Sequence, residues 1–523
     1  MMRPIRFSPA MALATVAMLA LFPFVRAARA QMPPTAATRN RPNVLFIAVD
    51  DLRPMLGCYG DETVRSPHID RLAASGTTFL RAYCQQAVCA PSRNSLLTGR
   101  RPDTIGIYDL ATNFRTRLPD VVTLPQHFKQ NGYFSARVGK VFHTAHGNTD
   151  DKASWTVQSD QPRRAADTAA QQSSEGGFRL AALQQTPEPP RPNQQQQRNN
   201  AAANQPAYAA PDVPDDRLSD GRIANNAIGW LRQMKAGDKP FFLAVGFLKP
   251  HLPFVAPKNY WDLYDPAKFD LAAHRDIPDG APRFASRGPG ELRSYKGIPK
   301  QGPIPDDLAR TLIHGYHASV SFMDAQVGKV LDELQRLGLS DNTIVVLWGD
   351  HGFQLGEHGN WCKHNNYEKS THAPLLVRAP AAFPQRRGAK TRALTEFVDI
   401  YPSLVALAGL PKPDGLEGTS FVPLLANPDA PGKKAAYSQW PRRANGSGGG
   451  GKEIGMGHAV RTDRYRFVEW TLFDDPSASV RELYDYGTGP LESLNIANRP
   501  ENARLVAEMK TLLRANERKA AAP

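Results

Sequence analysis

The chain has 523 residues, of which 41% are hydrophobic and 22% are charged, a balance that excludes a disordered polypeptide and provides for a large core. A length of this size predicts two domains rather than one. The formal net charge of +14 favours an anionic partner, but the basic residues are dispersed and form no recognised DNA- or RNA-binding motif, so we expect no nucleic-acid partner.

The N-terminus has the three parts of a secretory signal peptide. Arg3 and Arg6 precede the apolar run AMALATVAMLALFPF, and ARA at Ala28–Ala30 fits a cleavage site. The apolar run is shorter than the roughly 20 residues that a membrane span needs, so we expect no stable membrane insertion. The sequence therefore predicts a signal peptide at residues 1–30 and an exported protein, periplasmic or extracellular.

Four apolar runs predict buried strands, and they begin at Asn43 (NVLFIAV), Phe241 (FFLAVGF), Thr343 (TIVVLWG) and Ala373 (APLLVRAP). Continuous apolar runs are typical of strands covered on both faces, as in a parallel sheet. The clearest helical pattern spans roughly Asp307 to Leu337 and leads directly into the third strand. We predict an α/β fold, with a large mixed, mostly parallel sheet sandwiched by helices.

Composition divides the rest of the chain. Residues from about 165 to 214 are rich in Gln, Ala, Pro and Asn, which indicates a disordered surface insertion, and the glycine run after Ala444 indicates a flexible loop. Towards the C-terminus the pattern changes to short antiparallel strands and one terminal helix. We predict a main domain over residues 40–430 and a smaller C-terminal α+β subdomain over residues 431–523.

Acidic residues follow two of the predicted strands. Asp50 and Asp51 come after the first strand, and Asp350 and His351 come after the third. In open α/β sheets ligands bind beyond the carboxyl ends of the strands. Three carboxylates favour a hard ion, Ca²⁺ or Mg²⁺, whereas His351 alone would favour zinc. The alternative is that the two adjacent aspartates only cap a turn.

The four cysteines are too few for a disulfide scaffold in a chain of this length: Cys58, Cys84, Cys89 and Cys362. Cys58 and Cys84 form one possible pair, which the sequence leaves open. Pro91 is well placed as the first residue of a helix that ends at Gly99, which puts Cys89 at the helix N-terminus. Both an activated thiolate and an inert buried cysteine are compatible with that position. A plain thiolate beside a hard cation and three aspartates is electrostatically unfavourable, so an activated thiolate does not explain the segment.

Cys89-Ala-Pro-Ser-Arg93 matches the C-x-P-S-R signature of the type I, formylglycine-dependent sulfatases, and LLTGRRP continues it. Further segments match the family in the same order: VLFIAVDDLRPMLGCYG, RSPHIDRLAASGTTFLRAY, GKVFH, FFLAVGFLKPHLPF, GDHGFQLGEHGNWCKH and RELYDYGTGPLESLN. The chain resembles this family over most of its length outside the Gln-rich segment, and it most resembles the iduronate-2-sulfatase branch. The resemblance implies an alkaline-phosphatase-like sulfatase fold.

The resemblance also implies the chemistry of the site. Cys89 would be oxidised to Cα-formylglycine by a formylglycine-generating enzyme during maturation. One Ca²⁺ per chain, with Mg²⁺ as the alternative, would be held by Asp50, Asp51, Asp350, His351 and the modified Cys89. The residues that match those around the nucleophile and the sulfate are Arg93, Lys140, His143, His251 and Lys363.

These matches imply a role for each side chain. A hydroxyl of the hydrated aldehyde would attack sulfur, while Arg93, Lys140 and Lys363 neutralise the sulfuryl oxygens. His251 would be the general acid for the departing alcohol, and His143 the base for the second hydroxyl.

The expected substrate is a sulfated saccharide, with the 2-O-sulfate of iduronate or another uronate in a glycosaminoglycan-type oligosaccharide as the specific prediction. The pair Arg100-Arg101 fits either a contact with the substrate or a solvated helix end. The alternatives are another polysaccharide or aryl sulfatase, a phosphonate or phosphodiester hydrolase of the same superfamily, and a secreted glycan-binding pseudo-sulfatase.

Overall fold

The computed structural model describes residues 41–162, 205–286, 288–443, 453–475 and 479–520. The predicted signal peptide, the glycine run after Ala444 and most of the Gln-rich segment lie outside these ranges. Near the end of the Gln-rich segment, β5 (Tyr208–Ala209) pairs with β7 (Phe254–Val255), so the expectation of disorder was wrong for these residues. Within the described ranges, no helix has both the length and the apolar character needed to cross a membrane.

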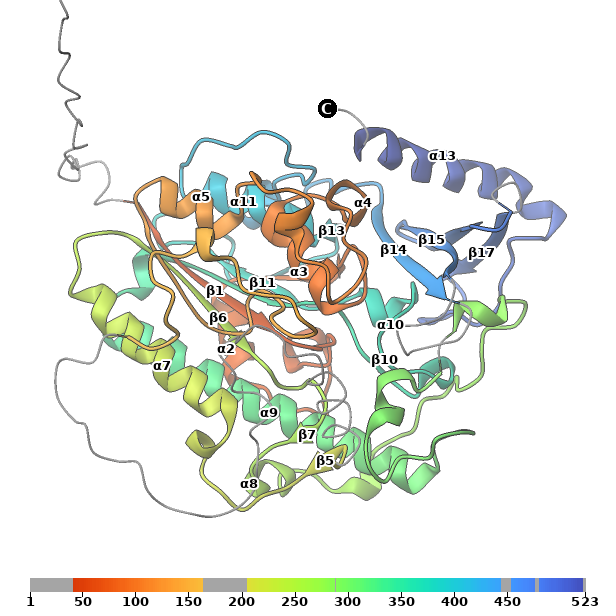
Figure 1. Ribbon diagram of the computed structural model, residues 1–523, viewed down its shortest axis with the longest axis horizontal. Coiled ribbons are helices and arrows are strands. Elements are labelled where there is room, and N and C mark those ends of the chain that lie inside the picture. The colour runs from red at the N-terminus through yellow and green to blue at the C-terminus, as the bar shows by residue number, and fades with distance from the viewer. Residues whose placement is uncertain (1–40, 163–204, 287, 444–452, 476–478, 521–523) are drawn as a thin grey trace, which may run out of the picture.

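A seven-stranded sheet forms the centre of the molecule (Figure 1), and its strands lie in the order β12 (Ala389–Thr391), β2 (Thr77–Phe79), β11 (Leu375–Arg378), β8 (Thr343–Gly349), β1 (Asn43–Val49), β6 (Phe241–Phe247) and β4 (Phe134–Gly139). Strands β8, β1, β6 and β4 are parallel to their neighbours in this group, whereas β11 is antiparallel to both β8 and β2. The predicted mixed, mostly parallel sheet is confirmed. The apolar run after Ala373 is its antiparallel member.

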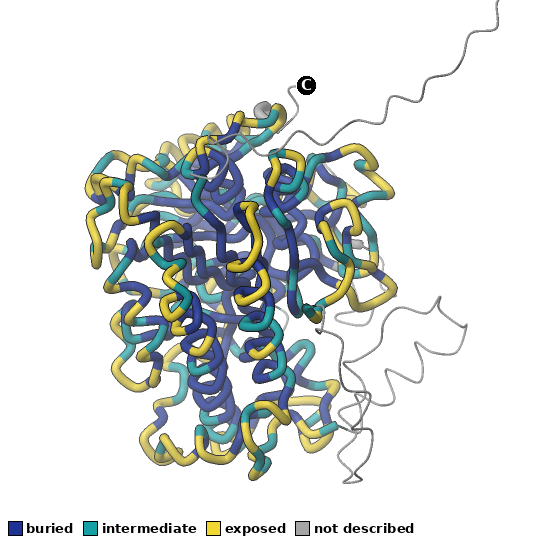
Figure 2. Tube along the Cα trace, turned by 90° about the vertical axis from the view of Figure 1, so that its left-hand side faces the viewer, coloured by how far each residue is buried: buried dark blue, intermediate teal, exposed yellow. Residues whose placement is uncertain are grey.

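Helices cover both faces of the sheet because β1 is buried on both sides. Leu45 and Ile47 belong to one core cluster, and Phe46 and Ala48 to the other. The first cluster includes residues of α2 (Pro67–Ser75), α7 (Ser219–Lys235) and α9 (Asp306–Arg336). The second includes residues of α3 (Cys89–Thr98), α5 (Leu124–Gln130), α11 (Ile400–Leu407) and α12 (Val422–Ala426). Figure 2 shows the buried residues gathered in the sheet and on the inward sides of the helices.

The C-terminal part is a four-stranded antiparallel sheet with one helix. Its strands are consecutive in the chain: β14 (Ala436–Arg443), β15 (Glu453–Arg461), β16 (Tyr465–Leu472) and β17 (Ser479–Asp485). Helix α13 (Ala503–Ala520) packs on it through Val506 and Met509. The remaining short strands and α-helices are β3 (Ala82–Tyr83), β9 (Gln354–Leu355), β10 (Trp361–Cys362), β13 (Thr395–Glu396), α4 (Pro102–Ile105), α8 (Lys258–Trp261) and α10 (Glu368–Thr371), and short 3₁₀ helices lie between them.

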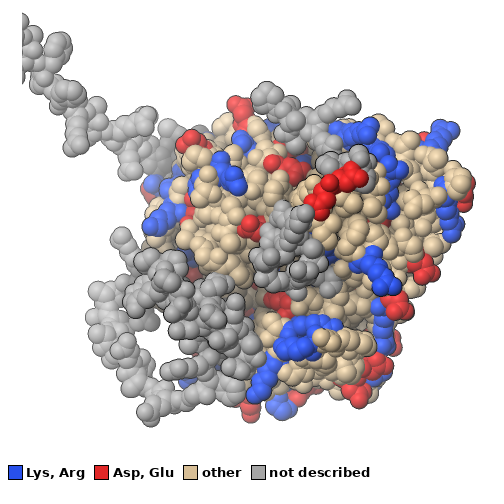
Figure 3. Space-filling view, turned by 45° about the vertical axis from the view of Figure 1, so that its right-hand side comes forward, with Lys and Arg blue, Asp and Glu red and all other residues tan. Residues whose placement is uncertain are grey.

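Charged groups are arranged differently on the surface and in the interior. On the face drawn in Figure 3, Lys and Arg side chains are interspersed with Asp and Glu. In the interior, Arg101 donates two hydrogen bonds to Glu396, at 2.7 and 2.8 Å, and Lys433 binds Glu396 and Asp399. The backbone N–H of Tyr437, in β14, also donates to Glu396. Arg101 is therefore neither a substrate contact nor a solvated helix end, but part of a buried junction with the C-terminal sheet.

Replacing Arg101 with Met is expected to destabilise the protein by about 3–5 kcal/mol, because it leaves a carboxylate buried without its main partner. The matched control is Arg464→Met, which removes a two-bond pair with Asp485 at the surface. The melting temperature should fall for Arg101→Met and stay unchanged for Arg464→Met. Equal melting temperatures for the two variants would contradict the assignment of Glu396 as a buried, compensated charge.

Candidate functional site

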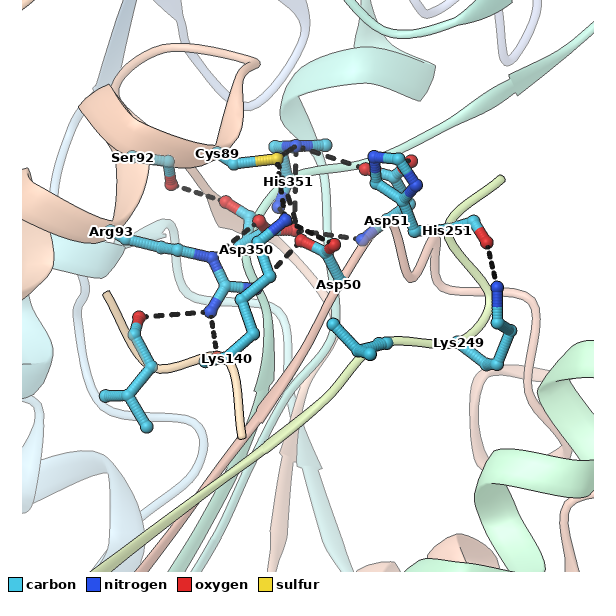
Figure 4. A network of polar contacts seen from close by, with 12 residues as sticks. Asp50, Asp51, Cys89, Ser92, Arg93, Lys140, Lys249, His251, Asp350 and His351 are labelled. Atoms are coloured by element: carbon cyan, nitrogen blue, oxygen red, sulfur yellow. Dashed lines mark hydrogen bonds and ion pairs between the residues drawn. The ribbon is translucent and has the colours of Figure 1, made fainter. Parts of the chain in front are cut away.

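Four parallel strands deliver most of the predicted site residues to one edge of the sheet (Figure 4). Asp50 and Asp51 follow β1, and Asp350 and His351 follow β8, whose last residue Gly349 is paired with Val49 of β1. Lys140 follows β4, and His251 lies in the loop after β6. The carboxyl ends of parallel strands meet at the same edge, which explains why residues about 300 positions apart come together.

The acidic residues form a compact buried group. Oxygen atoms of Asp50, Asp51 and Asp350 all lie within 4.8 Å of one another, and Nε2 of His351 is 3.3 Å from Asp51. Asp51 adopts a φ of 60°, in the left-handed region, and its backbone N–H donates to Asp350 at 3.0 Å. Three converging buried carboxylates are the donor set of a hard divalent cation, so the residues fit the predicted ion.

Cys89 opens helix α3, with Val88 as the N-cap, so the helix starts two residues before Pro91. Its Sγ is 3.5 Å from Nε2 of His351, 3.5 Å from Nζ of Lys140 and 3.6 Å from Asp50. Burial and the neighbouring Asp50 carboxylate raise the pKa of the Cys89 thiol well above its usual range. An unmodified thiol in this place is therefore a poor nucleophile, in agreement with the electrostatic objection to a plain thiolate.

Arg93 lies one helical turn after Cys89 and is completely buried. Its Nε and Nη2 donate to Asp350 and Asp50, each at 2.9 Å, and Nη1 donates to the backbone carbonyls of Lys140 and Val141. The guanidinium thus orients two carboxylates and joins β4 to α3. This geometry favours a role in holding the acidic group over a direct contact with a sulfate.

Lys140, Lys363 and His251 surround the acidic group and Cys89. Lys140 binds Asp50 at 2.5 Å, and Lys363 binds Asp51 at 2.8 and 2.9 Å. Burial alone would raise the pKa of Asp50, but Lys140 and Arg93 hold it well below its usual range. A ring nitrogen of His251 lies within 4.8 Å of both the Cys89 sulfur and Asp50.

His143 has a different environment from the other predicted residues. Its Nε2 is 3.0 Å from Nδ1 of His146, and the two rings stack with centroids 5.2 Å apart. Burial, and then the charge of Lys140, lower the pKa of His143 well below its usual range. The imidazole is therefore neutral at neutral pH, which is the state that a base requires.

Two residues near this site were missed from the sequence. Glu291 lies in a short 3₁₀ helix (Gly290–Ser294), 3.1 Å from Lys363 and 3.5 Å from His251. Burial would raise the pKa of Glu291, but Lys363 and then His251 lower it to about 2. Neither Glu291 nor His146 follows an apolar strand, and no pattern in the sequence marks them.

The four cysteines are all buried and none is bridged, so the pairing of Cys58 with Cys84 is not formed.

Comparisons with known proteins identify the family. Residues 42–410 match the family model described as Sulfatase, and residues 356–519 match that described as N-sulphoglucosamine sulphohydrolase, C-terminal. The protein of Mus musculus named iduronate 2-sulfatase is 36% identical over 533 residues, which cover 90% of this chain and 93% of that protein.

Two solved structures share the fold. One, a complex with its substrate D-glucosamine-2-N,6-O-disulfate, has a TM-score of 0.69 and 22% identity, and the match covers 92% of this chain and 98% of that one. The phosphonate monoester hydrolase of Agrobacterium radiobacter has a TM-score of 0.70 and 20% identity, covering 92% and 96%. The fold is thus the alkaline-phosphatase-like fold that sulfatases share with related hydrolases. Within this class the chain belongs to the sulfatase family, and its sequence resembles iduronate 2-sulfatase.

Removing divalent ions is expected to abolish activity and lower the melting temperature. An ion that binds only the folded state stabilises it by about 2.7 kcal/mol at a hundredfold excess over its Kd. Added Ca²⁺ or Mg²⁺ should restore both properties in the chelated protein. Calorimetry should detect no such stabilisation in Asp51→Asn, whereas Asp103→Asn, outside the acidic group, should respond normally. Restoration by zinc alone would show that the oxygen ligands do not determine the choice of ion.

Proposed function

We propose that this sulfatase removes the 2-O-sulfate of a uronic acid at the non-reducing end of glycosaminoglycan-type oligosaccharides. The proposal includes conversion of Cys89 to Cα-formylglycine, a single Ca²⁺ at the acidic group, and export after removal of residues 1–30. The observation that carries it is the setting of Cys89, with Lys140, His351 and Asp50 around a sulfur atom whose thiol is disfavoured as a nucleophile. The similarity to iduronate 2-sulfatase supports the choice of substrate.

Formylglycine, in its hydrated form, would supply one hydroxyl for attack on sulfur and a second that allows sulfate release. An ion held by Asp50, Asp51, Asp350 and His351 would supply Lewis acidity at the same place. The protein's own side chains provide the rest. Lys140 and Lys363 bring positive charge to the sulfuryl oxygens, and His251 donates a proton to the departing alcohol oxygen. His143, neutral and buried, accepts a proton.

The competing function is hydrolysis of phosphonate or phosphate esters, because a phosphonate monoester hydrolase shares the fold. Between a sulfate ester and a phosphate monoester, Glu291 favours sulfate. A phosphonate monoester carries one negative charge, as a sulfate ester does, so those two are separated by the comparison of substrates. A sulfate monoester carries one negative charge, whereas a phosphate monoester carries about 1.5 to 2 at neutral pH. The Glu291 carboxylate lies 3.1 Å from Lys363 and neutralises part of its positive charge. Less positive charge is then left to balance a second negative charge on the substrate.

Cys89 is expected to be converted when the chain is produced together with a formylglycine-generating enzyme. Trypsin releases Ala82–Arg93, which holds both Cys84 and Cys89, so Cys84 is an internal control. After treatment with iodoacetamide, mass spectrometry should detect alkylation of Cys84 and an aldehyde or its hydrate at position 89. Cys89→Ala should have no turnover. Fully active protein in which both cysteines are alkylated would refute the proposed nucleophile.

The preferred substrate is tested with defined disaccharides. We expect kcat/KM for a 2-O-sulfated uronate disaccharide to exceed that for a 6-O-sulfated glucosamine disaccharide by more than about tenfold, since binding contacts to a differently placed sulfate are lost. KM should rise with salt, because exposed charges are screened over about 8 Å at physiological ionic strength. A preference for the 6-O-sulfate, or for a phosphonate monoester, would contradict the proposed substrate and assign the protein to a different branch of the superfamily.

A further inference from the structure

Lys249 is a buried lysine whose ammonium group binds backbone carbonyls. It lies two residues after β6 and is 9% exposed. Its Nζ donates to the carbonyl oxygen of His251 at 2.7 Å and to that of Pro253 at 2.6 Å. Both acceptors belong to the turn that carries His251, so the side chain of Lys249 closes this turn on itself (Figure 4).

This ammonium group has no paired carboxylate to explain its burial. Across the described ranges, no Asp or Glu oxygen lies within 4.0 Å of Nζ of Lys249. Burying an ammonium costs several kcal/mol unless its hydrogen bonds replace those of water. A methionine of similar length would fill the same space without that cost. The two bonds to the turn are therefore the physical reason for a lysine here.

The other side of the same turn is held by helix α7. Asp220, 1% exposed, accepts hydrogen bonds from the backbone N–H groups of Leu248 and Lys249, each at 2.9 Å. The segment after β6 is thus fixed at two places, by Asp220 at Leu248 and Lys249 and by the side chain of Lys249 at His251 and Pro253. Asp220 and Lys249 both bind backbone groups of this segment, so both act on the site through the backbone.

The turn also determines which nitrogen of His251 faces the site. Nδ1 of His251 is 2.6 Å from the carbonyl oxygen of Leu252, which only accepts, so Nδ1 carries a proton. Nε2 is directed to the other side, 3.7 Å from Asp51 and 3.5 Å from Glu291. In the proposed function, the proton for a departing alcohol therefore comes from Nε2 of the doubly protonated ring, and the position of Nε2 depends on the turn.

We propose that Lys249 is a positioning residue for His251, and that its ammonium holds the turn so that Nε2 of His251 reaches the leaving-group oxygen. The inference rests on the proposed function, in which His251 is the general acid. Displacing a catalytic group by 1 Å costs about a hundredfold in rate. Loss of the two bonds, one to the carbonyl of His251 itself and one to that of Pro253, permits a displacement of that size.

The test separates a misplaced acid from a general structural defect by varying the leaving group. The matured protein is assayed with aryl sulfates whose phenols range from acidic, as in 4-nitrophenyl sulfate, to weakly acidic, as in phenyl and 4-methoxyphenyl sulfate. A phenol that leaves easily needs no proton, and one that leaves with difficulty does. The variants are Lys249→Met, which keeps the length and loses the donors, and His251→Ala as the reference.

For Lys249→Met we expect kcat on 4-methoxyphenyl sulfate to fall by about 10- to 100-fold, and kcat on 4-nitrophenyl sulfate to change by less than about threefold. KM should change little for either. Lys258→Met, an exposed lysine near the same segment, should behave as the unaltered protein. Lys249→Gln keeps an N–H donor on a shorter side chain, and its leaving-group dependence is expected to lie between those of the unaltered protein and Lys249→Met.

The outcomes distinguish the two proposals. Suppose that His251→Ala increases the dependence of kcat on the leaving group. If the Lys249 variants then show no such increase, or lose rate equally on all substrates, the positioning role is wrong. If His251→Ala itself loses rate equally on all substrates, its role as general acid in the proposed function is wrong. Should Lys249→Met fail to fold, which its melting temperature will reveal, the same comparison is made with Lys249→Gln.

Discussion

The structure depends on the burial of three aspartates at one end of its central sheet. Asp50, Asp51 and Asp350 are each no more than 1% exposed, and an uncompensated carboxylate in such a place costs several kcal/mol. Arg93, Lys140 and Lys363 provide the compensation, each from a different element. Helix α3, the end of β4 and the segment after β10 are therefore tied to the strand ends by charge. The same ties set the surroundings of Cys89.

The C-terminal sheet takes part in this arrangement by fixing the segment that leads into α3. The hydroxyl of Ser438 donates to the carbonyl of Cys84 at 2.7 Å, and the N–H of Gln439 donates to that of Gln85 at 2.8 Å. Val88, the residue before Cys89, packs in a cluster with Trp440. A small sheet at the end of the chain thus fixes the segment from which helix α3 begins. Its role is to place Cys89, and not only to close the core.

What the sequence predicted follows from local rules. The strand ends that carry Asp50 and Asp350 were predictable, because continuous apolar runs mark strands buried on both faces and parallel strands end at one edge. Strand β4 was not, since it is an edge strand in which Ser135 and Arg137 interrupt the apolar pattern. The antiparallel direction of β11 was equally hidden, because an apolar run carries no sign of its direction.

The parts of the site that were not predicted depend on contacts between distant segments, which local sequence patterns do not reveal. Glu291 reaches Lys363 from a loop without periodicity, and Arg101 is buried only because Glu396, 295 residues away, lies beside it. Such contacts depend on the tertiary arrangement of the loops around the sheet. Motif resemblance supplied Lys140 and Lys363, for which spacing and periodicity alone gave no reason.

The net charge of the side chains at the site is matched by a divalent cation and a singly charged ester bound at the same time. Three of its carboxylates belong to the acidic group and the fourth is Glu291, whereas the cationic side chains paired with them are Arg93, Lys140 and Lys363. These side chains alone carry one negative charge in excess, which repels any anionic ester. A divalent cation reverses the excess to one positive charge, which matches a sulfate monoester and is insufficient for a phosphate dianion. In the proposed function, the surplus basic charge of the chain attracts an anionic substrate from a distance, while this local balance would select between the two esters.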